Sequence, residues 1–414
     1  MIRLLPVLVL LASCGGNTSD EVGNASDIHD SITSIPAEIS TIKPEKLSVE
    51  MPEETQELSS KNLLEHFSFT IDTLLVNSKN TIIYLPRGID KSDLSRDKKN
   101  LYALNSKTNL VYQFDLDRLE LVKSYQYERE GPNSVPPDIW KFQLLNDSKL
   151  GFSYYNITGV YNLQTQKLSS YQFSENDFSS LIEDATMPKY EQLQLSLDGK
   201  QILFLHKNIK EEKVFLGIIN PENGKESLME LVEFGFLTQL YYSHSEGINH
   251  NVANSAALEM KIENNKAIIT SRGTSKVYLY NLSSGSLTFK EPHHQLAPND
   301  QIPPFPNEVS SVQEIMDASM GTIFQIAYND LAFDDEREIY FRFGSIMEET
   351  ENFNSNTKME VYLFAYDQNF NLLGEKKIES LTKVPKSYFF KDGKLWSYVN
   401  VEDELGFAVF TFDF

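Results

Sequence analysis

Short runs of apolar residues recur along the chain from about Leu63 onward, either alternating with polar residues or continuous. Residues 67–71, 81–85 and 276–280 are examples, rich in β-branched and aromatic side chains. Clusters of Asn, Asp, Gly and Lys separate the runs, as expected of turns between strands. Long stretches of helical periodicity are missing from the same region. The pattern predicts an all-β domain over residues 61–414.

A unit consisting of a strand, a terminal Asp or Asn and a turn recurs six times. The terminal residues are Asp115, Asn162, Asn220, Asn281, Asp367 and Asp413. The intervals between them are 47, 58, 61, 86 and 46 residues. A four-stranded propeller blade takes about 40–50 residues plus insertions, so six units predict a six-bladed β-propeller. A β-sandwich or a two-domain β protein would use the same turn chemistry and is the alternative.

The sixth unit coincides with the end of the chain, so no outermost strand follows it. We expect the strand-like residues 66–75 to take this place and close the ring, because closure removes exposed sheet edges. The 86-residue interval is long enough for a seventh blade, which is the alternative count. Residues 291–319 within it are rich in Pro, His and Asn and lack strand alternation. They therefore predict an insertion.

Residues 1–13 have the form of a lipoprotein signal peptide. Arg3 gives a positive start, residues 4–11 are apolar apart from Pro6, and Leu11-Ala12-Ser13-Cys14 matches a lipobox. This stretch is too short to span a bilayer as a helix. We expect cleavage before Cys14, the one cysteine of the chain, and a diacylglycerol anchor on it. The alternative is a short apolar N-terminus with an incidental cysteine.

Residues 14–60 are interpreted as the lipidated cysteine and a flexible acidic tether. Residues 15–60 contain no Phe, Tyr or Trp and are rich in Ser, Thr, Glu, Asp and Pro, a composition that buries too little apolar surface to fold. Ser19-Asp20-Glu21 resembles the surface-export signals of Bacteroidota lipoproteins. Gly15 after the cysteine fits the enterobacterial rule for release to the outer membrane. Together these features predict an outer-membrane lipoprotein that faces the periplasm or the cell surface.

Charge and cysteine content restrict the partners further. The formal net charge is −22, and loss of residues 1–13 removes only Arg3 and makes it −23. A chain this acidic repels nucleic acid and the anionic head groups of lipids. We therefore expect no nucleic-acid partner, and we expect contact with the membrane through the lipid anchor alone. With Cys14 lipidated, no thiol remains for a disulfide or a thiolate metal site.

Four of the seven histidines cluster within about fifty residues, in stretches that show no strand pattern. Two of these stretches flank a blade-like unit at residues 258–290, so their side chains could share one rim of the propeller. The candidate binding rim consists of His244, Glu246, His250, Glu291, His293 and His294. Imidazole and carboxylate groups suit zinc and other divalent ions, but no HExxH-like spacing occurs. We therefore predict no cofactor and keep a divalent-metal site as the alternative to solvated loop histidines.

Catalytic signatures are missing as well: the chain has no GxSxG elbow, no P-loop and no GxGxxG after a strand. Carboxylates contributed by different blades would leave no local spacing. Trp140 and Trp396 are interpreted as packing residues, with stacking on a sugar as the alternative role. The predicted function is a non-catalytic binding module for an envelope protein, a peptide or a glycan. The alternative is a hydrolase or lyase that acts on an extracellular glycan or peptide.

Glu130-Gly131-Pro132-Asn133 lies between two blade-like units and forms a Gly-Pro turn after an acidic residue. With the lipobox, the tether and the repeat, it resembles a feature of certain Bacteroidota lipoproteins with six-bladed propeller domains. Residues 60–414 are similar to one such family, a domain of unknown function. The resemblance implies the fold and export, and it assigns no catalytic residue.

Overall fold

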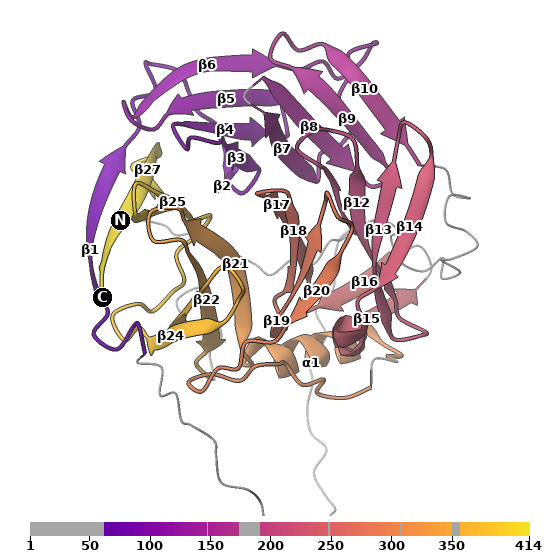
Figure 1. Cartoon of the computed structure of the whole chain (residues 1–414), viewed down its shortest axis with the longest axis vertical. Coiled ribbons are helices and arrows are strands. Elements are labelled where there is room, and N and C mark those ends of the chain that lie inside the picture. The colour runs from indigo at the N-terminus through magenta and orange to yellow at the C-terminus, as the bar shows by residue number, and fades with distance from the viewer. Residues whose placement is uncertain (1–61, 147, 174–190, 247–248, 307–308, 350–356) are drawn as a thin grey trace, which may run out of the picture. The chain divides into compact units, whose positions relative to one another are not determined.

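Six four-stranded antiparallel sheets stand around a common axis as the blades of a propeller in the computed structural model (Figure 1). The structure describes residues 62–146, 148–173, 191–246, 249–306, 309–349 and 357–414. The tether predicted over residues 14–60 and the signal peptide lie outside the described residues. The six-bladed fold predicted from the repeat is confirmed, and no seventh four-stranded sheet occurs in the described ranges.

Five blades each take their four strands from one continuous segment of the chain. Blade 1 contains β3 (Ser92–Leu94), β4 (Asn100–Asn105), β5 (Leu110–Asp115) and β6 (Glu120–Gln126). Blade 2 contains β7 (Lys141–Asn146), β8 (Lys149–Tyr154), β9 (Ile157–Asn162) and β10 (Lys167–Gln172). Blade 3 contains β11 (Glu191–Leu195), β12 (Ile202–Asn208), β13 (Lys213–Asn220) and β14 (Lys225–Glu230). Blade 4 contains β17 (Leu258–Glu263), β18 (Lys266–Ser271), β19 (Thr274–Asn281) and β20 (Leu287–Lys290). Blade 5 contains β21 (Ala327–Asp334), β22 (Ile339–Met347), β23 (Met359–Tyr366) and β24 (Leu372–Lys377).

Blade 6 combines both ends of the domain. It contains β25 (Phe389–Lys391), β26 (Lys394–Val401), β27 (Glu404–Asp413) and, outermost, β1 (Ser68–Leu75). β1 pairs antiparallel with β27 in unbroken register from Ser68 opposite Asp413 to Leu75 opposite Gly406. Closure of the ring by the N-terminal strand is confirmed. A short strand, β2 (Pro86–Ile89), then leads into blade 1.

The repeated Asp or Asn residues lie at the end of the third strand of each blade or directly after it, and in five blades their side chains make the turn that follows. Asn162 Oδ1 accepts hydrogen bonds from the backbone N–H groups of Gln164 and Gln166 at 3.0 and 2.9 Å. Four of the other repeat residues accept from the backbone two to four positions ahead in the same way; they are Asp115, Asn220, Asn281 and Asp367. A short polar side chain that caps its own turn explains why these residue types recur.

Each pair of neighbouring blades encloses its own apolar core. In β4, Leu101 and Ala103 pack against blade 6, whereas Tyr102 and Leu104 pack against blade 2. The two-residue period of a strand produces this division, because successive side chains lie on opposite faces of the sheet. The same arrangement at each of the six interfaces gives six cores around the ring.

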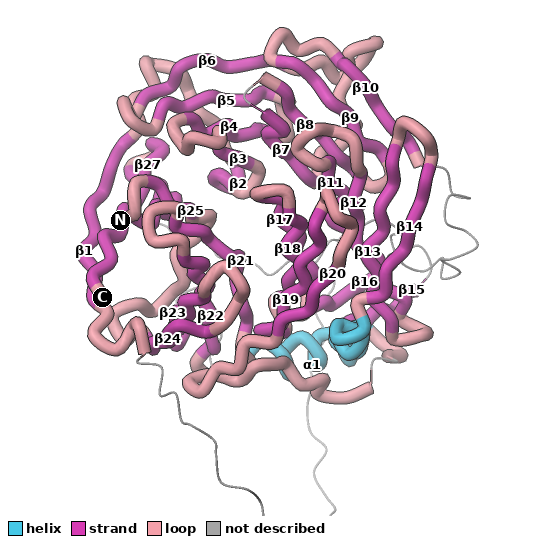
Figure 2. The backbone as a smooth tube through the Cα atoms, in the orientation of Figure 1, coloured by secondary structure: helices cyan, strands magenta, loops and turns pink. Residues whose placement is uncertain are grey.

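Insertions at one edge of the ring account for the longest intervals (Figure 2). A 3₁₀ helix, η1 (Val232–Leu240), and a hairpin of β15 (Tyr241–Glu246) and β16 (Asn249–Asn254) lie between blades 3 and 4. The 86-residue interval contains α1 (Val312–Ile323). The residue before it, Ser311, caps the helix, because its side chain accepts a hydrogen bond from the Glu314 N–H. Ile315 and Ala318 of α1 pack on Tyr242 of the hairpin. No helix among the described residues is long and apolar enough to cross a membrane.

The prediction of a strand at residues 81–85 is wrong. These residues are irregular, although Ile83 and Leu85 pack against the core between blades 6 and 1. Blade 1 already has four strands, and positive φ angles at Lys79 and Asn80 turn the chain just before the segment. Ile82 is 88% exposed as a result.

Candidate functional site

The rim residues predicted from sequence do not lie together in loops. His244 belongs to β15 and His250 to β16, so the interpretation of this stretch as irregular is wrong. The side chains of Glu246 and His250 lie outside what the structure describes. Glu291 follows β20, and its Oε1 lies 3.6 Å from Nζ of Lys276. No group of three His, Cys, Asp or Glu residues that could hold a metal occurs within the described ranges.

His294 is a structural residue, in contrast to its exposed neighbour His293. Its ring stacks on Phe364 with the centroids 3.8 Å apart, and both ring nitrogens are hydrogen-bonded. The Tyr328 hydroxyl donates to Pro298 O, so it accepts from Nδ1 of His294 at 2.7 Å. Nε2 therefore accepts from Tyr366. Burial lowers the pKa of His294 to about 3, with smaller contributions from Arg342 and His293, so the ring is neutral. Because both ring nitrogens are hydrogen-bonded, neither is available for a ligand.

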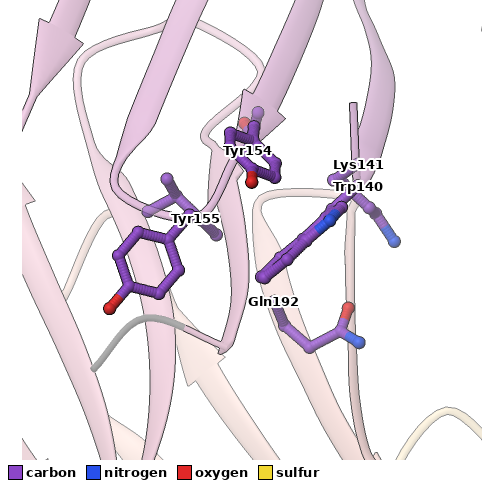
Figure 3. Close-up of a pocket in the computed structure, with 7 residues that line it drawn as sticks. Trp140, Lys141, Tyr154, Tyr155 and Gln192 are labelled. Atoms are coloured by element: carbon purple, nitrogen blue, oxygen red, sulfur yellow. The ribbon is translucent and has the colours of Figure 1, made fainter. Parts of the chain in front are cut away.

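A small aromatic pocket of about 100 Å³ opens between blades 2 and 3 (Figure 3). It is lined by Trp140, Lys141, Ser153, Tyr154, Tyr155, Gln192 and Leu193. Trp140 directly precedes β7, Tyr154 ends β8, Tyr155 lies in the turn that follows, and Gln192 belongs to β11. The loops and strand ends of two adjacent blades thus build one site.

The aromatic side chains of this pocket are held in place but remain accessible. The Trp140 N–H donates to Ser153 O at 2.9 Å, which fixes the backbone. The indole contacts Tyr154 and Tyr155 edge to face, with centroid distances of 5.0 and 6.0 Å. Trp140 is nevertheless 49% exposed and Tyr155 40% exposed. The interpretation of Trp140 as a packing residue is therefore wrong, whereas Trp396 is buried between Phe389 and Phe407.

Gln192 reaches the pocket from an irregular point in β11. The pairing register of β11 with β12 shifts between Glu191 and Gln194, and Gln192 has a positive φ of 50°. Such bulges redirect side chains and are common beside functional sites. The amide of Gln192 and the ammonium of Lys141 lie next to the exposed indole (Figure 3). An open aromatic face with adjoining hydrogen-bonding groups suits a ligand with one apolar face and several hydroxyls.

A second group of functional side chains lies nearer the axis, where charges from several blades meet. Lys261 of β17 forms an ion pair of 2.6 Å with Glu263 on the same strand. Leu258 and Met260 of β17 pack in the core towards blade 3, so strand alternation places Lys261 and Glu263 on the opposite side. There Lys261 interacts with Asp93 of blade 1 and Asp330 of blade 5. Residues of three blades can converge in this way only around the axis.

The pKa values of these groups are shifted in different directions. Burial raises the pKa of Asp93. The backbone N–H groups of Leu94 and Leu144 donate to its carboxylate and act to lower the pKa, but burial has the larger effect. Burial also acts to raise the pKa of Glu263, but Lys261 and a hydrogen bond from Tyr340 outweigh it and lower the pKa. For Lys261, burial acts to lower the pKa, and the surrounding carboxylates together raise it. Glu263 and Lys261 are accordingly charged at neutral pH.

Polar residues of successive inner strands also connect the blades to one another. Asp93 Oδ2 accepts from the Leu144 N–H of blade 2 at 2.9 Å. Gln143 Oε1 accepts from the Leu195 N–H of blade 3 at 2.9 Å. Gln194 then donates to Met260 O of blade 4. These three links fix the inner strands that carry both the aromatic pocket and the axial charges.

Comparison with solved structures gives a relative of the same fold. A crystal structure of a DUF4221 family member from Bacteroides vulgatus matches with a TM-score of 0.62 and 12% sequence identity, over 84% of this chain and 98% of that chain. A Bacteroides fragilis structure named "Putative exported protein" matches with a TM-score of 0.46 and 9% identity, over 85% and 96% of the two chains. At 12% identity the likeness to the Bacteroides vulgatus structure concerns the fold alone. No curated protein matches.

The family itself is shown by sequence. The model of DUF4221, a domain of unknown function, matches residues 63–377, which is most of the chain. The match begins within the segment that leads to the closing strand and extends to the end of blade 5. It confirms the family resemblance inferred from the repeat and the Gly-Pro turn. The chain belongs to the DUF4221 family of six-bladed β-propellers.

Proposed function

We propose that this protein is an exported, lipid-anchored propeller that binds a sugar of an envelope or extracellular glycan without catalysing its conversion. The observation that carries the proposal is the accessible indole of Trp140, held edge to face by two tyrosines beside Gln192 and Lys141. Sugars present a flat apolar face of C–H groups that packs on such a ring, while amide and ammonium groups bond to their hydroxyls.

The N-terminal sequence supports the location. Cys14 in the lipobox and the aromatic-free acidic segment after it fit an anchor and a spacer that hold a binding domain off a membrane surface. The net charge of −22 favours neutral or cationic ligands over anionic ones. A neutral glycan meets this condition.

The proposal is tested by tryptophan fluorescence, because the chain has two tryptophans. Trp396→Phe leaves Trp140 as the only indole, and this variant is titrated with gluco-, xylo-, manno- and galacto-oligosaccharides. We expect a saturable change of emission with at least one of them, and Gln192→Ala should weaken that binding by about tenfold, the effect of one lost hydrogen bond of about 1.4 kcal/mol.

The matched control is Val122→Ala, which changes another exposed side chain outside the pocket and should leave the affinity unchanged. Emission that stays constant with every oligosaccharide, together with an unchanged melting temperature, would refute the proposal.

A hydrolase or lyase acting on an extracellular glycan or peptide is the second candidate, and one observation favours it. Asp93 and Glu263 share the neighbour Lys261, but burial raises the pKa of Asp93 and the ion pair lowers that of Glu263. Carboxyl groups with opposite pKa shifts are the usual arrangement of an acid and a base. The test is product analysis after incubation with polysaccharides and peptides. Cleavage that is abolished by Glu263→Gln, in a variant with an unchanged melting temperature, would favour this candidate over binding alone.

A further inference from the structure

A second cavity, distinct from the aromatic pocket, lies in the closing blade. Its volume is about 180 Å³, and it is lined by Asp72 and Leu74 of β1, Lys391 and Asp392 at the end of β25, and Lys394 and Trp396 of β26. The strand register explains the grouping, because Asp72 and Trp396 are both paired with Val409 of β27 and Lys394 is paired with Lys391. The cavity therefore crosses the blade from its outermost to its innermost strand.

Trp396 lines this cavity and carries an unsatisfied hydrogen-bond donor. The residue is 7% exposed, and its indole N–H is buried without an acceptor among the described residues. Buried donors in native proteins are almost always hydrogen-bonded, since leaving one unpaired costs about 1–3 kcal/mol. A bound molecule that supplies an acceptor at this position would satisfy the indole.

The charges around the cavity are balanced but only partly paired. Lys391 Nζ lies 2.7 Å from Asp117 of blade 1 and 2.5 Å from Asp392, so its charge is neutralised within the protein. Asp72 and Lys394, in contrast, have no ion-pair partner in the described part of the chain. The lining thus offers one unpaired carboxylate and one unpaired ammonium group, together with the buried indole N–H of Trp396 that lacks an acceptor.

We propose that this cavity binds a small zwitterion, an α-amino acid. Its carboxylate would accept from the Trp396 N–H and pair with Lys394, and its ammonium group would pair with Asp72. A simple anion or cation satisfies only one of the two free charges, and an uncharged sugar satisfies neither, whereas an α-amino acid carries both signs in one small molecule. Because Asp72 lies on β1 and Lys394 on β26, the bound molecule would also connect the closing strand to the rest of the blade.

The test uses the full-length chain with Trp140→Phe, which leaves Trp396 as the only indole reporter. This variant is titrated separately with each of the standard L-amino acids except tryptophan, and both emission and melting temperature are recorded. We expect a saturable emission change and a rise in melting temperature with at least one amino acid, since a ligand that binds only the folded state stabilises it. Asp72→Asn and Lys394→Gln should each weaken the binding by about tenfold or more.

The matched control is Glu402→Gln, an exposed charge in the turn between β26 and β27, which should leave the affinity unchanged. Acetate and ethylammonium are the ligand controls and should each produce no saturable response. The proposal is overturned if no amino acid changes either signal, if either control ion reproduces the response, or if binding survives in the double variant Asp72→Asn/Lys394→Gln. Since Trp140 is absent from these variants, the outcome is independent of the proposed glycan site.

Discussion

His294 shows how a polar side chain can be part of a propeller core. Its two ring nitrogens bond to Tyr328 and Tyr366, and its ring stacks on Phe364, so the neutral ring fits the site and a charged ring does not. These two hydrogen bonds fix the tautomer with the proton on Nδ1, because Nδ1 donates to Tyr328 and Nε2 accepts from Tyr366. Folding therefore selects one protonation state of this residue.

A pH dependence of stability follows. The pKa of His294 falls from 6.5 to about 3 on folding, so between these values the unfolded chain binds a proton that the folded chain excludes. The contribution of this residue to stability is complete above pH 6.5 and is lost as the pH decreases, by about 1.4 kcal/mol per pH unit in this window. Urea denaturation at several pH values measures the slope. His294→Gln should reduce it, and His66→Ala, which removes an exposed histidine outside this cluster, is the control; equal slopes in all three proteins would contradict the prediction.

Gly217 is a second residue whose identity is dictated by packing. It lies opposite Phe204 in the β12–β13 pair, and a Cβ atom at this position would come within 2.0 Å of the Phe204 ring. We expect Gly217→Ala to destabilise the protein by about 1–3 kcal/mol, because the buried ring cannot move without strain. A double-mutant cycle with Phe204→Leu checks the cause. If the two changes proved additive, the proposed clash would be wrong.

At the scale of the elements, the closing strand holds the ring together through aromatic contacts as well as hydrogen bonds. Phe67, just before β1, packs against Phe412 with the ring centroids 4.9 Å apart and an angle of 75°. It also contacts Phe414 at 6.2 Å. The N-terminal strand thus enters the core between blades 5 and 6.

We expect Phe67→Ala to reduce the free energy of unfolding by about 3–5 kcal/mol, the usual cost of removing a buried aromatic side chain. Ile71→Ala, on the same strand but 49% exposed, should change it by less than about 0.5 kcal/mol. Chemical denaturation of both variants measures the difference. A similar small loss in both would show that closure depends on the backbone ladder alone.

The elements that sequence predicted best are those with a local physical cause. Asn162 and four of its equivalents mark the end of the third strand of a blade, because an Asx turn needs only its own neighbouring residues. The segment 81–85 was misassigned because its exclusion from a sheet depends on blade 1 being complete, which no local pattern reveals. For the same reason Trp140 and Gln192, contributed by two blades, could not be joined from sequence. The adjacent aromatic residues Tyr154 and Tyr155, at the end of a strand and in its turn, were the local signal of an aromatic surface.

The candidate binding rim shows what a local sequence pattern cannot predict. Glu291, His293 and His294 follow one another closely in sequence, but His293 is exposed whereas His294 is buried among tyrosines. The burial of His294 depends on Tyr328 and Tyr366, which lie 34 and 72 positions further along the chain. Residue type and spacing alone do not contain that information.

At the scale of the whole molecule, the lipobox predicts where the domain resides. Cys14→Ala should prevent lipidation and shift the protein from the membrane fraction to the soluble fraction on cell fractionation. Ser13→Ala keeps a small residue before the cysteine and is the control that should remain with the membrane. A Cys14→Ala protein that still sediments with membranes would contradict a lipid anchor.

The pairing of Ser68 with Asp413 also has a consequence for how the chain is made. Among the described strands, β1 is synthesised first and its sheet partner, β27, last, so β1 and the adjacent Phe67 remain unpaired while five blades form. Contacts separated by so many residues are the slowest to form, because a long loop has to close before they contribute. During that delay a copy of β1 from a second molecule can occupy the same edge of β27. Crowded, newly made chains are therefore at risk of exchanging their first strands and assembling as swapped dimers.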